Sequence, residues 1–198
     1  TYTHGHADAV LRSHRWRTVE NSAPHLIPHL RPGLDILDVG CGPGTITADL
    51  AARVAPGRVV GMDRSPEVIA EASAAHPDVT FVVGDVYALD AGDAELDVVH
   101  AHQVLQHLSD PVAALREMRR VCRPDGIVAV RDSDYAALTW GPPDPELDEW
   151  LRVYRAVARG NAAEPDAGRF LKGWAREAGF SSVSVSASVW VFSEADER

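Results

Sequence analysis

The sequence is poor in basic residues and in cysteine. Its 198 residues include 19 Lys and Arg against 29 Asp and Glu, which gives a formal net charge of −10. Duplex nucleic acid is bound mainly by basic side chains that neutralise phosphates, so this balance argues against a nucleic-acid partner, although a local basic patch could survive the acidic average. The two cysteines, Cys41 and Cys122, lie far apart without a CxxC pair, so they predict neither a disulfide framework nor a zinc knuckle.

The sequence also lacks a long apolar run and a secretory signal. No stretch approaches the roughly 18 apolar residues that span a bilayer, and no basic segment followed by an apolar one opens the chain. We therefore expect a cytoplasmic protein that binds no membrane, as a monomer or a homodimer. Since there is no initiator Met, we also expect the chain to have been trimmed or to begin inside a longer protein.

What the sequence does have is an alternation of strands with helices. Apolar types make up 45% and charged types 24% of the residues, and a chain of this length can form one well-packed domain. Five short runs are apolar at their centres, which is typical of strands covered on both faces. They are Asp35–Val39, Arg58–Asp63, Val79–Gly84, Leu96–Ala101 and Gly126–Asp132. Strand–helix–strand order with short connections predicts an α/β, Rossmann-like fold with a doubly wound, mainly parallel sheet and helices on both faces.

Capping residues mark where several helices begin. Ser65-Pro66-Glu67 supplies an N-cap, a proline at the first helical position and a first-turn acid, and Asp110-Pro111 repeats the first two. Residues 7–30 predict one or two helices with a break around Ser22-Ala23-Pro24, and another helix begins at about Pro145. The apolar stripe of that helix comprises Leu147, Trp150, Leu151, Tyr154 and Ala158.

The C-terminal part predicts one helix and one strand. Residues 168–178 have a helical pattern that ends at Gly179, a favourable residue just past a helix C-terminus. Ser182–Phe192 alternates strictly between polar and apolar types, which predicts a strand with one face more exposed to water. Residues 193–198 resemble the first turn of another helix, so we expect the natural chain to extend beyond Arg198.

A glycine-rich segment directly follows the first predicted strand and opens a helix. It reads Leu37-Asp38-Val39-Gly40-Cys41-Gly42-Pro43-Gly44-Thr45. Glycines permit a sharp strand-to-helix turn and let a ligand lie against bare backbone, where the helix N-terminus favours an anion. The dinucleotide fingerprint G-x-G-x-x-G does not fit, because the third glycine comes one residue early. This mismatch disfavours an NAD-linked oxidoreductase, which remains an alternative.

Acidic residues follow the second and third predicted strands. Asp63, 23 residues after Gly40, could accept hydrogen bonds from both ribose hydroxyls of an adenosine bound over the glycine turn. Gly84-Asp85-Val86 ends the third strand, where the Asp could accept from an adenine amino group while a neighbouring backbone N–H donates to the ring.

With these motifs the sequence resembles the class I S-adenosylmethionine-dependent methyltransferases, and most of all their ubiquinone/menaquinone-biosynthesis-type small-molecule members. The resemblance rests on LDVGCGPGT at 37–45, VVGMDRSP at 59–66, VVGDV at 82–86 and the segment 96–126. It implies the class I methyltransferase fold and in-line transfer of a methyl group from S-adenosylmethionine to an oxygen, nitrogen or carbon of a small molecule, leaving S-adenosylhomocysteine. A cofactor-binding protein without turnover is a further alternative.

The resemblance also divides the chain and assigns its cofactor residues. We expect a single domain with an N-terminal helical lid at 1–34, a cofactor-binding core at 35–132, a substrate-side insertion at 133–165 and a C-terminal helix and strand at 166–198. The glycines would receive the methionine end of the cofactor, Asp63 the ribose and Asp85 the adenine edge. The full implied set is Asp38, Gly40, Cys41, Gly42, Gly44, Thr45, Asp63, Arg64, Gly84, Asp85, Val86, His102 and Gln103.

The acceptor side is predicted from position at the carboxyl edge of the sheet. His102 is the candidate general base, because imidazole has an ordinary pKa near neutrality. His100, His102 and His107 lack a carboxylate or thiol spaced to complete a metal site, so we expect no metal. Cys41 is interpreted as a packing residue. Further candidates for the lid or the substrate pocket are Tyr2, His6, Trp16, Arg17, Asp132, Tyr135, Trp140, Trp150 and Tyr154.

The resemblance finally predicts an incomplete sheet. The family's sheet normally ends in an antiparallel strand pair, whereas this chain offers only Ser182–Phe192 after its last helix. We therefore expect an unpaired sheet edge there, or a neighbouring chain that covers it.

Overall fold

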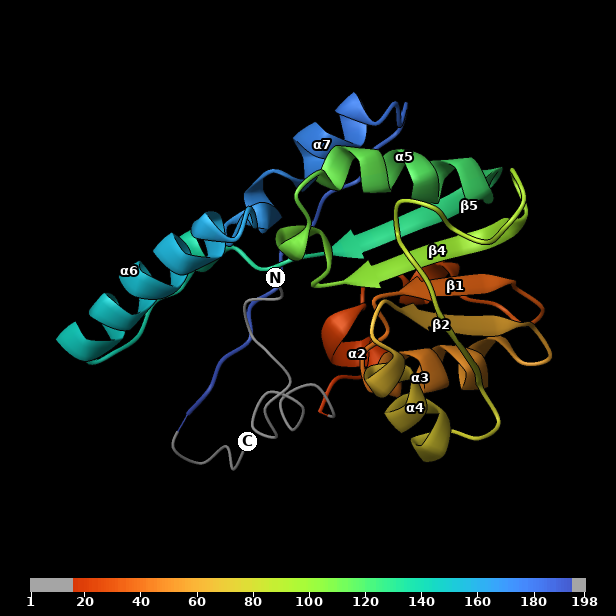
Figure 1. The fold of residues 1–198 in the computed structure, drawn as a ribbon, viewed down its shortest axis with the longest axis horizontal. Helices are drawn as coiled ribbons and strands as arrows, with labels where there is room; N and C mark the ends of the chain where they lie inside the picture. The colour runs from red at the N-terminus through yellow and green to blue at the C-terminus, as the bar shows by residue number, and fades with distance from the viewer. Residues whose placement is uncertain (1–15, 194–198) are drawn as a thin grey trace.

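The computed structural model of the chain describes residues 16–193. Its core is a five-stranded parallel sheet with the strand order β3-β2-β1-β4-β5 (Figure 1). The strands are β1 (Ile36–Val39), β2 (Val59–Asp63), β3 (Thr80–Val83), β4 (Leu96–His102) and β5 (Cys122–Arg131). The helices are α2 (Val19–Ser22), α3 (Thr45–Val54), α4 (Pro66–Ala75), α5 (Pro111–Val121), α6 (Pro145–Gly160) and α7 (Leu171–Glu177), with short 3-10 turns η1 (Ile27–His29), η2 (Leu105–His107), η3 (Tyr135–Ala137) and η4 (Ala167–Arg169). The predicted doubly wound α/β fold is thus confirmed.

Two separate apolar cores cover the two faces of the sheet. Alternate residues of a strand point to opposite faces, so Ile36 packs with α2 and α3 while its neighbour Leu37 packs with α5. The first core includes Leu50 of α3, and the second includes Leu115 of α5; both leucines are almost fully buried. The sheet therefore lies between two helical layers, and the loops that follow the strands lie at its carboxyl edge.

The predicted helix caps are present. The Ser65 hydroxyl accepts a hydrogen bond from the backbone N–H of Val68 (3.3 Å), and the Asp110 carboxylate accepts one from Ala113 (2.8 Å). Both caps satisfy backbone donors that have no partner inside the helix. The fifth strand, by contrast, begins at Cys122 rather than at Gly126, because pairing with β4 starts at Leu96–Cys122 and continues across a register shift.

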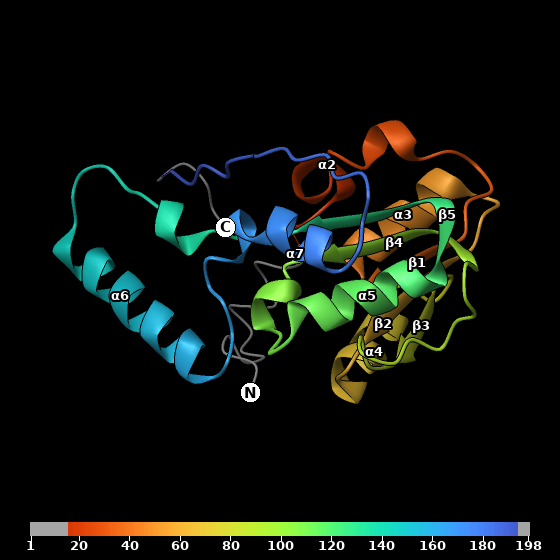
Figure 2. The ribbon, with the colours of Figure 1, turned by 90° about the horizontal axis from the view of Figure 1, so that it is seen from above.

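Two strand predictions are corrected by the structure. β3 is not covered on both faces: it is an edge strand with Val82 and Val83 40% and 54% exposed. Ser182–Phe192 forms no strand; it runs past α2 (Figure 2), where the Trp190 indole N–H donates to the Asn21 carbonyl (2.8 Å). Within residues 16–193, β5 is consequently an unpaired edge, and the sheet ends there as expected.

The helical flanks agree with the sequence in part. In the described part of 7–30, helix α2 ends at Ser22 and Ala23 is its non-helical C-cap, so the helical segment is interrupted where predicted. The helix predicted at 168–178 is split into η4 and the shorter α7, and Gly179 follows with a φ of +92°. None of the helices within residues 16–193 is long and apolar enough to cross a membrane.

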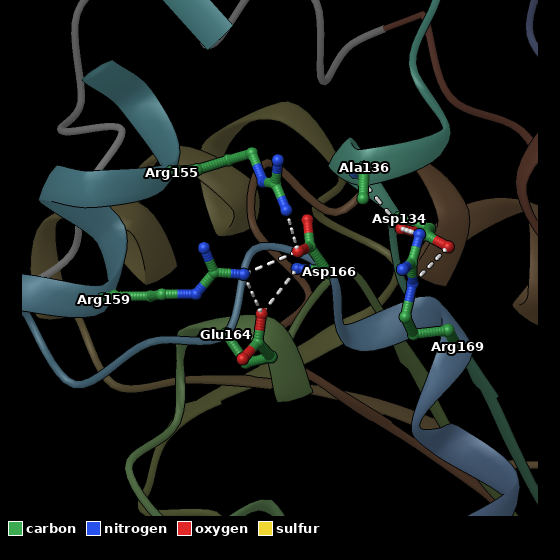
Figure 3. Close-up of polar contacts among 7 residues, drawn as sticks. All are labelled: Asp134, Ala136, Arg155, Arg159, Glu164, Asp166 and Arg169. Atoms are coloured by element: carbon green, nitrogen blue, oxygen red, sulfur yellow. Dashed lines mark hydrogen bonds and ion pairs between the residues drawn. The ribbon is translucent and has the colours of Figure 1, made fainter. Parts of the chain in front are cut away.

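Helix α6 projects away from the sheet in both ribbon views (Figures 1 and 2). Its predicted apolar stripe is only partly covered: Ala158 is buried, Leu151 and Tyr154 are partly buried, and Leu147 and Trp150 are exposed. The base of the helix is fastened by ion pairs (Figure 3). Asp166, 3% exposed, accepts hydrogen bonds from Arg155 and Arg159, each at 2.6 Å.

Candidate active site

The glycine turn joins β1 to α3 at the carboxyl edge of the sheet. Gly40, Gly42 and Gly44 all have positive φ, at +66°, +55° and +83°. At Gly40 a Cβ would also lie 2.4 Å from Cγ2 of Val104, so this position requires glycine for space as well as for conformation. At Gly42 no atom lies within 4 Å of the place a Cβ would take. The turn is therefore packed against the protein at Gly40 and open at Gly42, where a ligand can approach the backbone.

Asp38 is buried beneath this turn and joins three elements. Its Oδ2 accepts a hydrogen bond from the Thr47 hydroxyl of α3 (2.6 Å), and its Oδ1 lies 2.7 Å from Nδ1 of His100 in β4. Both partners satisfy a carboxylate that is only 2% exposed. His100 is fully buried inside the sheet rather than at its edge. In residues 16–193 no group of three or more His, Cys, Asp or Glu side chains is arranged to hold a metal ion.

Asp63 links the ends of the first three strands. Its Oδ2 accepts a hydrogen bond from the backbone N–H of Gly42 (3.3 Å), and its Oδ1 accepts one from Ser65 (3.1 Å). The backbone N–H of Gly84 donates to the Asp63 carbonyl oxygen (3.0 Å). Each carboxylate oxygen keeps a further lone pair, so Asp63 can still accept hydrogen bonds from a bound hydroxyl pair.

The loop after β3 carries the other predicted adenine contacts. The Asp85 carboxylate accepts a hydrogen bond from the backbone N–H of Tyr87 (3.0 Å) and closes a turn, while Val86 is buried and Arg64 is exposed. Beside them, Cys41 is buried; this burial, together with the nearby carboxylates of Asp38 and Asp63, raises the pKa of its thiol. The thiol is held in its neutral form, which favours the interpretation of Cys41 as a packing residue.

His102, at the end of β4 and predicted to face the acceptor, is paired with Arg131 at the end of β5. Its Nε2 lies 3.0 Å from a guanidinium nitrogen of Arg131. Because a guanidinium only donates, Nε2 is the acceptor and the proton of the neutral ring is on Nδ1. The next residue, Gln103, has a positive φ of +56°; its side chain accepts from Arg17 (2.7 Å) and donates to Ser133 (2.9 Å).

Trp190, from the C-terminal segment, packs against His102 and Arg131 at the carboxyl ends of β4 and β5. The Arg131 guanidinium carbon lies 4.3 Å from the ring centroid of Trp190, and the rings of Trp16 and His102 lie 5.3 and 5.7 Å from it. Arg131 and Trp190 were not among the sequence candidates. The place of Arg131 at the carboxyl end of a strand could have drawn attention to it, whereas nothing local in the sequence marks Trp190.

The acidic residues in the loop after β5 have different environments. The carboxyl of Asp132 accepts a hydrogen bond from the backbone N–H of Gln106 (3.0 Å), and burial raises its pKa to about 7. Asp134 forms an ion pair with Arg169 at 2.8 Å (Figure 3), which occupies its carboxylate. Trp140, which lies between η3 and α6, is partly buried.

Three of the remaining candidates form a row of aromatic rings that runs from the loop after β5 to α6. The rings of Tyr135 and Tyr154 lie 4.5 Å apart, and Trp150 stacks on Tyr154 at 5.7 Å. Burial raises the pKa of the Tyr135 hydroxyl. Tyr2 and His6 lie outside the described residues.

Several known proteins are similar to this chain in sequence. The sequence matches the family described as "Methyltransferase domain" over residues 37–130. An uncharacterised methyltransferase of Schizosaccharomyces pombe is 35% identical over 210 residues, which cover all of this chain and 75% of that protein. A demethylmenaquinone methyltransferase of Beutenbergia cavernae is 34% identical over 143 residues, which cover 72% of this chain and 58% of that protein.

A solved structure shows the same fold at lower identity. An S-adenosylmethionine-dependent methyltransferase of Thermotoga maritima matches with a TM-score of 0.63 over 88% of this chain and 76% of that chain, at 19% sequence identity. Three observations indicate the same family: the parallel sheet, the glycine turn after its first strand, and the similarity to the S. pombe methyltransferase. The chain therefore belongs to the class I S-adenosylmethionine-dependent methyltransferases.

Proposed function

We propose that this chain transfers the methyl group of S-adenosylmethionine to an oxygen, nitrogen or carbon atom of a small organic molecule. The observation that carries the proposal is the contact between Asp63 and Gly42, which joins a carboxylate able to accept from ribose hydroxyls to a turn of open backbone. The membership of the family supports methyl transfer as the activity, and the residues present fit the cofactor that the family uses.

Three groups of residues would hold the cofactor. The backbone of Gly40, Gly42 and Gly44, with the N-terminus of α3 at Thr45, would receive the methionine end, because its N–H groups favour a carboxylate. Asp63 would accept from the ribose hydroxyls, and Asp85 and Val86 would border the adenine. Asp38, Cys41, Arg64, Gly84, His102 and Gln103 complete the proposed set. When bound, S-adenosylmethionine supplies an electrophilic methyl group on a sulfonium whose leaving group is already good, so this chain's residues contribute mainly alignment.

Proton transfer at the acceptor is proposed for His102. Its ring stands at the carboxyl edge, 6% exposed, beside the turn that would hold the cofactor. Because its Nε2 already accepts from Arg131, His102 can take a proton there only after that hydrogen bond is released. Asp132 and Tyr135 stand in the next loop, but the Asp132 carboxyl faces backbone N–H groups and the Tyr135 ring faces Tyr154. His102 is therefore the better-placed group.

A small-molecule acceptor is supported by charge and by relatives. The net charge of −10 disfavours RNA as an acceptor, and one relative above is named for demethylmenaquinone, a small molecule. We propose that 1–34 forms a lid, that 35–132 holds the cofactor, that 133–165 contributes to the acceptor pocket and that 166–198 supports it. The aromatic row of Tyr135, Tyr154 and Trp150 supplies apolar surface for that pocket.

The direct test is transfer of a labelled methyl group into a library of metabolites. Incubation with S-adenosylmethionine labelled at the methyl should give at least one labelled small product, together with stoichiometric S-adenosylhomocysteine. The Asp63→Ala variant should give neither at the same cofactor concentration. Cofactor binding without label in any small molecule, and with label in RNA or protein instead, would contradict the proposed acceptor class.

A further inference from the structure

Arg131 is a partly buried cation that forms no ion pair within residues 16–193. It is the last residue of β5, and burial lowers the pKa of its guanidinium, while the nearby Asp132 carboxyl acts in the opposite direction without forming an ion pair. Within residues 16–193 no carboxylate oxygen lies within 4.0 Å of it; its contacts are the imidazole of His102 and the ring of Trp190. Asp132, its neighbour in sequence, accepts instead from the backbone of Gln106. A buried charge is normally paired, so the absence of a pair needs a reason.

Three other partly buried arginines of this chain, Arg120, Arg123 and Arg155, form ion pairs with acidic residues. Arg120 is held by Glu117 and Asp93, each at 2.7 Å, and Arg155 by Asp166 at 2.6 Å. Arg123 pairs with Asp97. The chain holds ten more acidic than basic side chains, so carboxylates are abundant. The missing partner at Arg131 is thus a local feature of the carboxyl edge of the sheet.

The surroundings of Arg131 leave donors available at the acceptor side. A guanidinium stacked on an aromatic face keeps its N–H groups in its own plane, where they can meet an acceptor edge-on. Within residues 16–193, one of its nitrogens is engaged in a hydrogen bond, toward Nε2 of His102. β5 lies two strands from β1, so the backbone of Arg131 is roughly 10 Å across the sheet edge from the glycine turn. That separation suits an acceptor placed beside the cofactor.

A second arginine faces the same tryptophan. The guanidinium carbon of Arg17 lies 5.8 Å from the Trp190 centroid, and Arg17 also donates to Gln103, the residue after His102. Two cations, one imidazole and the rings of Trp16 and Trp190 thus meet at one corner. In this corner, the two guanidinium groups supply positive charge and the two indole rings supply flat apolar surface.

We propose that this corner, with Arg131 as its anchor, binds a carboxylate carried by the methyl acceptor, so that the acceptor is a small organic acid. This inference rests on the proposed function, since it specifies the acceptor of the same site. The planar guanidinium fork matches a carboxylate better than it matches a neutral carbonyl, because two parallel hydrogen bonds form and the buried charge is neutralised. A carboxylate that takes over the Arg131 donors also releases Nε2 of His102 on the side where the acceptor lies.

The test compares carboxylic acids with their amides in the full chain saturated with S-adenosylhomocysteine. Benzoate, hexanoate and succinate are titrated beside benzamide, hexanamide and succinamide, by calorimetry and by quenching of tryptophan fluorescence. The expected result is that at least one acid binds about 10- to 100-fold more tightly than its amide. In Arg131→Gln that preference should vanish, in Arg131→Lys it should be partly kept, and in the control Arg176→Gln, an exposed residue of α7, it should be unchanged.

Affinity for S-adenosylhomocysteine is measured in every variant and separates the two proposals. Wild-type cofactor affinity in Arg131→Gln shows that the variant is folded, and Arg131→Lys serves in its place if the glutamine variant does not fold. Retained cofactor binding with no acid preferred over its amide, or with a preference that survives Arg131→Gln, overturns the carboxylate site and leaves the proposed function standing. Displacement of the bound acid by inorganic phosphate but by no amide would show a general anion site and also contradict the preference for carboxylates.

Discussion

The backbone N–H of Gly42 donates a hydrogen bond to the Asp63 carboxylate across 3.3 Å, so the residue proposed to bind ribose also fixes the glycine turn. The two features were separate motifs in the sequence, one after each of two neighbouring strands. Their contact means that Asp63 and the turn act as a unit. Loss of the carboxylate should therefore affect cofactor binding both directly and through the turn.

We expect Asp63→Ala to weaken S-adenosylhomocysteine binding by about 2–4 kcal/mol, since each hydrogen bond to a charged group contributes about 1.5–3 kcal/mol and the two overlap. Isothermal titration calorimetry measures the loss. Asp78→Ala is the matched control, because Asp78 is an exposed carboxylate just before the amino-terminal end of β3, whereas the glycine turn lies at the carboxyl ends of the strands. Unchanged affinity in Asp63→Ala would refute the ribose assignment.

Alanine at Gly40 and at Gly42 should have different effects. A non-glycine residue in the left-handed region costs on the order of 1–3 kcal/mol, and both positions carry this cost. Only Gly40→Ala also drives a Cβ into the Val104 side chain, so its thermal midpoint should fall further than that of Gly42→Ala. Adding Val104→Ala should recover part of the loss in Gly40→Ala and nothing in Gly42→Ala. Equal midpoints for the two single variants would show that the turn is not packed as described.

Asp132 should make stability fall as pH rises. Its pKa is raised to about 7 in the folded chain against an ordinary value of about 4, so between these values the folded state keeps a proton that the unfolded state releases. The free energy of unfolding should therefore decrease across this window by up to about 1.4 kcal/mol per pH unit from this group. Asp132→Asn should remove this pH-dependent contribution in denaturant titrations at pH 4 to 8, whereas Asp125→Asn, at an exposed position near the start of β5, should keep it. A pH dependence identical in wild type and Asp132→Asn would contradict the assignment.

Local signals explain what could be predicted from the sequence. The glycine turn, the cap at Ser65 and the order of the strands each depend on residues within a few positions of one another. The prediction of a strand at Ser182–Phe192 was wrong, because an alternating pattern does not by itself supply a neighbouring strand to pair with. Trp190 instead donates a hydrogen bond to Asn21 and packs on Arg131. The pairing of Arg131 with Trp190 joins distant parts of the chain through tertiary packing, so no local pattern could reveal it.

Replacing His102 tests the proposed proton transfer. If His102 accepts the acceptor's proton, His102→Ala and His102→Gln should lower methyl transfer by about 10²–10⁴-fold and flatten its pH profile between pH 6 and 9, because general-base catalysis contributes that much. Affinity for S-adenosylhomocysteine is measured in parallel to exclude a loss of cofactor. Turnover within a few-fold of wild type, with the same pH profile, would mean that His102 only shapes the pocket and that alignment alone carries the reaction.

Whether the glycine turn and Asp63 hold S-adenosylmethionine can be decided by a single calorimetric comparison. S-adenosylhomocysteine and NAD are titrated separately into the wild-type chain, with Asp63→Ala beside it. We expect one binding site for S-adenosylhomocysteine, with weaker affinity in the variant. We expect no measurable heat from NAD, because the third glycine of the turn comes one residue too early for the dinucleotide fingerprint. Saturable binding of NAD without binding of S-adenosylhomocysteine would contradict both expectations.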